Sequence, residues 1–162
     1  MLQVFLLLHA LGAIFVFGPT VAFTFLASEN RRLPGHGHFA AVVGDAIERK
    51  VVLPGAVVQG VTGVCLIFLA GFDLTQASSR WLVGGLTLYA IAIVFAFAVQ
   101  APNATKMVEL TKTPPPAPQP GEAPKGPPPE IMALGQKLAR GGMFLTVLIV
   151  LIVSLMVLKP GF

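Results

Sequence analysis

The chain has 162 residues, of which 55% are hydrophobic and only 11% are charged. A soluble domain usually carries about 25% charged residues, so this composition excludes an ordinary soluble protein and indicates a membrane protein of one domain. The net charge of +4 does not indicate nucleic-acid binding, because the basic residues flank apolar runs, where they set membrane orientation. The single cysteine, Cys65, excludes an internal disulfide.

Four uncharged apolar runs predict four transmembrane helices, because backbone polar groups in lipid have to be satisfied within each segment. We expect these helices over about 2–27, 51–71, 81–100 and 138–158. A run of about 20 residues crosses a hydrocarbon core of about 30 Å. The last run is short, so its helix is expected to start near Leu138, with Arg140 reaching toward the headgroups. The predicted fold class is all-α, a four-helix transmembrane bundle.

The distribution of basic residues predicts the orientation of the bundle. The two long connections, after the first and after the third helix, hold nine of the 11 Lys and Arg residues: Arg31, Arg32, Arg49, Lys50, Lys106, Lys112, Lys125, Lys137 and Arg140. Only Arg80 and Lys159 lie elsewhere. The positive-inside rule therefore places both termini outside and both long connections in the cytoplasm of a bacterial inner membrane.

The first long connection contains an amphipathic segment over residues 39–49. Apolar residues recur there at helical spacing, while Asp45, Glu48 and Arg49 take the other face. This pattern predicts either a helix lying on the inner leaflet or an extension of the second transmembrane helix.

The second long connection contains a proline-rich linker over residues 113–129. Nine of its 17 residues are proline, so it cannot build a core and favours polyproline II. It is interpreted as a spacer, with a docking arm as the alternative.

His9 is the one histidine inside an apolar run, and the rest of the chain offers a sparse polar layer at similar depth. That layer consists of His9, Gln59, Thr62, Cys65, Tyr89 and Ser154. An imidazole in lipid is costly without a partner, so we expect His9 to face the interior near Thr62 or Cys65 and Gln59 to bond across a close helix contact. His9 then holds the bundle in register, or it serves as a cofactor ligand or proton carrier.

A second pair of histidines, His36 and His38, lies in the sequence PGHGH of the first long connection. Two imidazoles form an incomplete metal site, to which Asp45 and Glu48 could add oxygen ligands. The alternative is a solvated loop.

The first two helices resemble those of a bacterial family of four-helix predicted integral membrane proteins of unknown function. The resemblance rests on His9, Gly12 and Gly18 in the first helix and on Pro54 and the Thr62–Gly63 pair in the second. More distantly, the first helix is similar to CopD-type copper-resistance proteins and HemJ-type protoporphyrinogen oxidases. The HemJ resemblance implies a haem held by the first-helix histidine, although the tryptophan and arginine of that pattern are missing here.

These patterns favour a non-catalytic membrane protein, an accessory or scaffold subunit of a larger assembly. No Ser–His–Asp set, paired carboxylates, phosphate loop or CxxC motif occurs in the sequence. One alternative is a membrane redox protein that binds haem b or copper through His9, and a second is a small permease. The expected partners are the lipid bilayer and either other subunits or further copies of the chain, with no nucleic acid.

Overall fold

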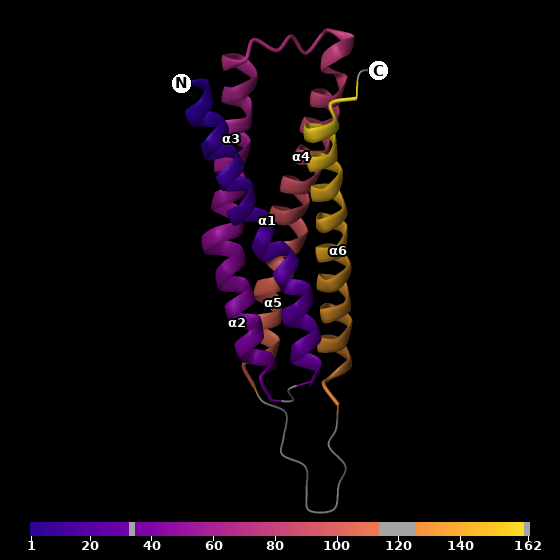
Figure 1. The fold of residues 1–162 in the computed structure, drawn as a ribbon. Helices are drawn as coiled ribbons and strands as arrows, with labels where there is room; N and C mark the ends of the chain where they lie inside the picture. Colours follow the sequence, from indigo (N-terminus) through magenta and orange to yellow (C-terminus); the bar gives the residue numbers. More distant parts are fainter. Residues whose placement is uncertain (33–34, 114–125, 161–162) are drawn as a thin grey trace, which may run out of the picture.

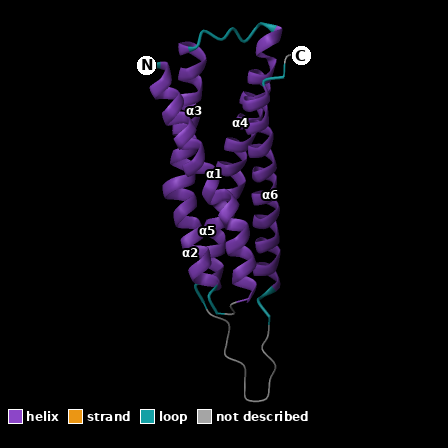
Figure 2. Ribbon diagram, viewed as in Figure 1, coloured by secondary structure: helices purple, strands orange, loops and turns teal. Residues whose placement is uncertain are grey.

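The computed structural model describes residues 1–32, 35–113 and 126–160, which form long helices with no strand among them (Figure 1, Figure 2). In chain order the helices are α1 (Leu2–Arg32), α2 (Gly37–Ile47), the π-helical turn η1 (Glu48–Val52), α3 (Leu53–Leu69), the 3-10 turn η2 (Ala77–Ser79), α4 (Arg80–Phe95), the π-helical turn η3 (Ala96–Gln100), α5 (Ala101–Thr111) and α6 (Pro129–Leu158). Most of the proline-rich linker, residues 114–125, lies outside the described residues.

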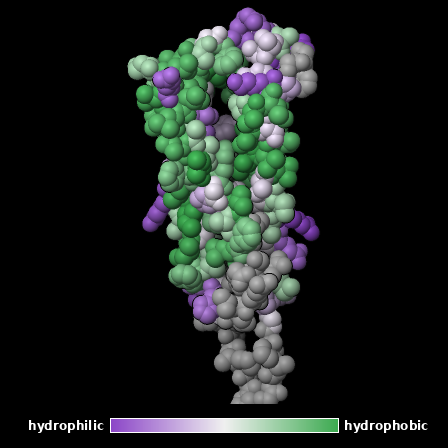
Figure 3. Space-filling model, viewed as in Figure 1, coloured by the Kyte–Doolittle hydropathy of each residue, from purple (hydrophilic) through white to green (hydrophobic). Residues whose placement is uncertain are grey.

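Four of the described helical segments are long and apolar enough to cross a membrane. They cover Leu2–Phe23, Gly37–Leu69, Ala77–Thr111 and Pro129–Leu158. This finding confirms the all-α fold class with four membrane-spanning helices. The second and third segments, with 33 and 35 residues, exceed the roughly 20 residues that a bilayer needs. The bundle therefore extends beyond the hydrocarbon at one end, where α2 and α5 lie. Hydrophobic residues cover most of the visible face above that end (Figure 3).

The helices run up and down as two hairpins. α1 packs on α3, α4 packs on α6, and α2 packs on α5, while α1 and α6 join the hairpins. Both termini lie at the same end of the bundle as the α3–α4 connection (Figure 1). Buried residues form two small apolar clusters: Leu53, Ala96, Ala101 and Leu145 in one, and Ile67, Trp81 and Leu82 in the other.

The two π-helical turns have a common cause in the sequence. Pro54 follows η1 and Pro102 follows η3 at the same spacing. A proline has no backbone N–H, and its ring collides with the carbonyl four residues earlier, here Lys50 or Ala98, in the middle of the π turn. Widening the helix by one residue at that point removes the collision while the helix continues.

Residues 39–49 extend the second transmembrane helix, which is one of the two interpretations that the sequence allowed. α2 continues through η1 into α3 and packs on α5 instead of forming a separate helix. One member of the expected polar face is placed differently, because Glu48 is buried at 5% exposure, whereas Arg49 of the same face is exposed. The extra residue of the π turn rotates α2 by about 100° relative to α3, which changes the face that each residue occupies.

Candidate functional site: the polar contact between α1 and α3

His9 on α1 meets two polar side chains of α3 inside the bundle. Its Nδ1 lies 3.0 Å from the Thr62 hydroxyl oxygen, and its Nε2 lies 3.2 Å from the Gln59 amide nitrogen. Gln59 and Thr62 are buried, and His9 is half-buried. The structure thus places His9 on Thr62, one of the two partners expected from depth, and places Gln59 across the helix contact as expected.

Counting protons assigns the histidine tautomer. The Thr62 hydroxyl has one proton and lies 3.0 Å from the carbonyl oxygens of both Val58 and Gln59 on its own helix. With that proton given to the backbone, His9 Nδ1 carries a hydrogen and donates to Thr62. His9 Nε2 then accepts from the Gln59 amide nitrogen. Both ring nitrogens are therefore occupied in this tautomer, while the buried Gln59 Oε1 has no hydrogen-bond partner among the described residues.

Small residues let the two helices approach at this level. A Cβ placed on Gly12 would lie 2.5 Å from Gln59 Oε1, and one on Gly63 would lie 3.1 Å from His9 Cε1. One turn further along, a Cβ on Gly55 would lie 2.6 Å from Val16 Cγ2. Glycine at each position removes the methyl group that would hold α1 and α3 apart.

The remaining members of the predicted polar layer do not join His9. The Tyr89 hydroxyl on α4 donates to the Ala56 carbonyl and so connects α4 to α3. The Ser154 hydroxyl donates to Val150 of its own helix at 2.7 Å. Cys65 is a half-buried free thiol. The expected layer is therefore divided into an α1–α3 contact and a separate α3–α4 contact.

A second polar cluster, which the sequence did not predict, lies where η1 meets α5. Thr105 donates to Asp45 at 2.8 Å, and Arg49 pairs with the same carboxylate at 3.2 Å while also donating to Thr105. Next to this cluster Glu48 is buried, and its Oε1 has no hydrogen-bond partner among the described residues. The sequence signal that could have located Glu48 is Pro54, because it forces the π turn that rotates Glu48 inward.

The histidine pair His36 and His38 is not completed as a metal site. His38 Nδ1 lies 3.1 Å from the Thr111 hydroxyl at the end of α5, and His36 precedes α2 without capping it through its side chain. Asp45, the expected additional ligand, is bonded to Thr105 and Arg49. Within the described part of the chain, no three His, Cys, Asp or Glu side chains are grouped to hold a metal ion.

Four apolar helices joined by polar interhelical contacts define a polytopic α-helical integral membrane protein. The chain belongs to the family described as predicted integral membrane protein (DUF2269), which matches residues 3–160. This match confirms the membrane family of unknown function that His9, Gly12 and Gly18 indicated. No curated protein and no solved structure matches the chain.

Proposed function

We propose that the chain is a non-catalytic integral membrane protein that serves as an accessory or scaffold subunit of a larger membrane assembly. The observation that carries this proposal is the polar contact of His9 with α3. Because Gln59 and Thr62 occupy both ring nitrogens, the one histidine within an apolar span is used to join α1 to α3. Few residues of the spans are buried, only 11% to 28% of the most apolar 18-residue stretch of each, which leaves broad apolar faces for lipid or neighbouring subunits.

The competing redox proposal starts from the distant resemblance of the His9 segment in α1 to CopD-type and HemJ-type proteins. A haem b iron or a copper ion at His9 would need one ring nitrogen to leave Gln59 or Thr62. An absorption spectrum of the purified protein separates the two proposals. A Soret band that disappears in His9→Ala, with the bundle still assembled, would refute the non-catalytic proposal.

The assembly proposal is tested on the full chain in its own membrane. We expect a tagged chain, extracted with a mild detergent and separated by native electrophoresis, to migrate well above its 17.0 kDa mass with a partner at a fixed ratio. Chemical crosslinking before extraction should give the same partner. Migration as a single chain, or only as copies of itself, would refute an accessory role.

We further propose a bacterial inner-membrane location with both termini and the α3–α4 connection outside. The support is the charge distribution, since nine of the 11 basic residues belong to the two connections at the opposite end. Cysteine labelling in a Cys65→Ala background tests it. An impermeant maleimide added to intact spheroplasts should label Thr75→Cys and leave Glu109→Cys unlabelled, and the reverse pattern would overturn the orientation.

A second candidate, a small permease, is favoured by Glu48. A buried carboxylate with an oxygen that lacks a partner among the described residues is costly, and such groups in membrane bundles commonly mark ion or proton paths. Proton flux into proteoliposomes tests this candidate. Glu48→Gln should abolish the flux, while Glu109→Gln, an exposed acid paired with Lys112, should not. Flux equal to that of empty liposomes would eliminate the permease.

A further inference from the structure

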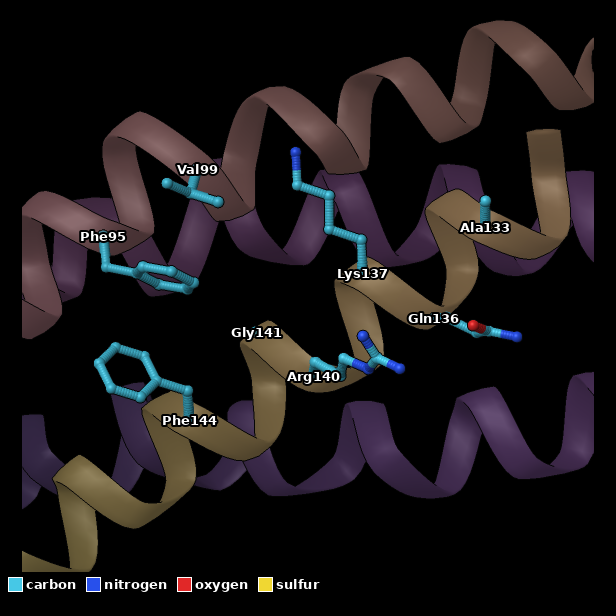
Figure 4. A pocket seen from close by; sticks show the side chains of 8 residues that line it. All are labelled: Phe95, Val99, Ala133, Gln136, Lys137, Arg140, Gly141 and Phe144. Atoms are coloured by element: carbon cyan, nitrogen blue, oxygen red, sulfur yellow. The ribbon is translucent and has the colours of Figure 1, made fainter.

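A groove of about 570 Å³ opens on the side of the bundle between the α4–η3 segment and α6 (Figure 4). Its apolar wall contains Phe95, Val99, Gly141 and Phe144, and Lys137 and Arg140 follow along α6, with Gln136 and Ala133 beyond them. The Phe95 and Phe144 rings meet edge to face, with centroids 4.9 Å apart. The groove thus combines an aromatic, apolar stretch with two cations next to it along α6.

The two cations lie on one helix face and have no counter-ion among the described residues. Lys137 and Arg140 are three residues apart on α6, a spacing that makes them neighbours, and both are exposed. Neither forms an ion pair with any described residue, and their side chains extend beside the groove (Figure 4). Two other cations at this end are paired, because Lys106 lies 3.0 Å from Glu130 and Lys112 lies 2.8 Å from Glu109.

The position of the cations along α6 matches the headgroup level of a bilayer. Arg140 precedes Leu158, the last residue of α6, by 18 residues, which at 1.5 Å per residue is about 27 Å. A hydrocarbon core is about 30 Å thick, so the Arg140 guanidinium can reach phosphates at its edge. Lys137 lies almost one turn further out, whereas Phe144 lies one turn deeper. The apolar wall therefore extends into the acyl-chain region.

We propose that this groove binds one anionic phospholipid from the leaflet at this end of the bundle. Its phosphate lies between Lys137 and Arg140, and one acyl chain follows Phe95, Val99 and Phe144. Two unpaired cations complement a headgroup with net negative charge, such as phosphatidylglycerol, while the quaternary ammonium of phosphatidylcholine adds a third positive charge beside them. Charge complementarity together with the apolar wall of the groove thus selects a lipid rather than a soluble anion.

The proposal is tested by native mass spectrometry of the intact protein in detergent, titrated with dioleoyl phosphatidylglycerol or dioleoyl phosphatidylcholine. We expect one phosphatidylglycerol to be retained in preference to phosphatidylcholine. A basic residue near an anionic headgroup contributes about fivefold in affinity, so Lys137→Gln/Arg140→Gln should weaken phosphatidylglycerol binding by about 30-fold. The matched control, Lys106→Gln/Lys112→Gln, removes the same charge at the same end and should change the affinity less than about twofold.

Two further measurements test whether the apolar wall contributes to binding and whether a free anion competes for the site. Phe144→Ala, at a 40% exposed side chain, should weaken binding of the dioleoyl lipid, and inorganic phosphate at millimolar concentration should not displace it. Equal affinity for the two lipids, an equal loss in both double variants, or displacement by inorganic phosphate would each overturn the proposal. A size-exclusion profile identical to that of the unaltered chain ensures that each variant is folded.

Discussion

Replacing Gly12 with alanine is expected to weaken the contact between α1 and α3. The added Cβ would lie 2.5 Å from Gln59 Oε1, which is closer than real Cβ contacts, so the end of the Gln59 side chain has to shift and its bond to His9 is weakened. Overpacking costs about 1–3 kcal/mol, and an interhelical hydrogen bond contributes about 0.6 kcal/mol. Alanine returns about 1 kcal/mol through its better helix propensity. The net loss in the free energy of unfolding is therefore about 0.6–2.6 kcal/mol.

Gly18 offers the matched control on the same helix. A Cβ at Gly18 meets no described atom within 4 Å, so Gly18→Ala should be neutral or stabilising by up to about 1 kcal/mol. The assay is reversible unfolding in micelles, measured by steric trapping, with both variants compared with the unaltered chain. We expect the two variants to differ by about 2 kcal/mol. Equal stability would refute the close approach of α1 and α3 at Gly12.

Three further predictions follow from the polar groups. His9→Leu should lower the free energy of unfolding by about 1–2 kcal/mol in the same assay. The double variant His9→Leu/Gln59→Leu should lose less than the sum of the two single variants, because removing both partners leaves neither side of the His9–Gln59 bond unpaired. Additive losses would contradict that bond. Tyr89→Phe should cost less than about 2 kcal/mol, measured likewise, because it removes only the hydrogen bond to the Ala56 carbonyl; no loss at all would contradict that bond. Hydrogen bonds from the Thr75 hydroxyl and amide, and from Gln76, hold the pKa of Asp73 below its usual range. The bonds to the ionised Asp73 carboxylate are therefore fully formed above the ordinary aspartate pKa and are lost as the pH falls through the lowered pKa of Asp73. The pH dependence of the Asp73 carboxyl chemical shift, measured by NMR, should show this. Titration at the ordinary pKa would contradict these bonds.

The spans and the His9 contact could be predicted because each depends on a short-range rule. An uncharged run of about 20 residues in lipid has to be helical, so composition alone located the four spans. His9 and Thr62 were predicted to meet because the rise per residue along antiparallel helices places both at the same depth in the membrane. Gly12 indicated which face of the first helix makes the close contact. These inferences need only a regular rise per residue and one favourable partner.

The face of Glu48 could not be predicted from periodicity, because the prediction assumed an unbroken α-helix. One extra residue in η1 rotates the preceding helix α2 about its axis relative to α3, so Glu48 faces the interior and Phe39 faces outward. The continuation of the third expected helix, 81–100, into α5 was not predicted, for a different reason. Polar residues end an apolar run, but this helix continues because α5 packs on α2 beyond the hydrocarbon.

The two proline-linked π turns have a consequence for how the protein fits bilayers of different thickness. η1 and η3 lie at one level, since Leu53 after η1 clusters with Ala96 and Ala101 at the two ends of η3. Interrupted backbone hydrogen bonds make both helices easiest to bend at this level. Bending of the second and third spans at this level would offset a mismatch in bilayer thickness, at a cost of fractions of a kcal/mol per Å, while α1 and α6 pass the same level as unbroken helices.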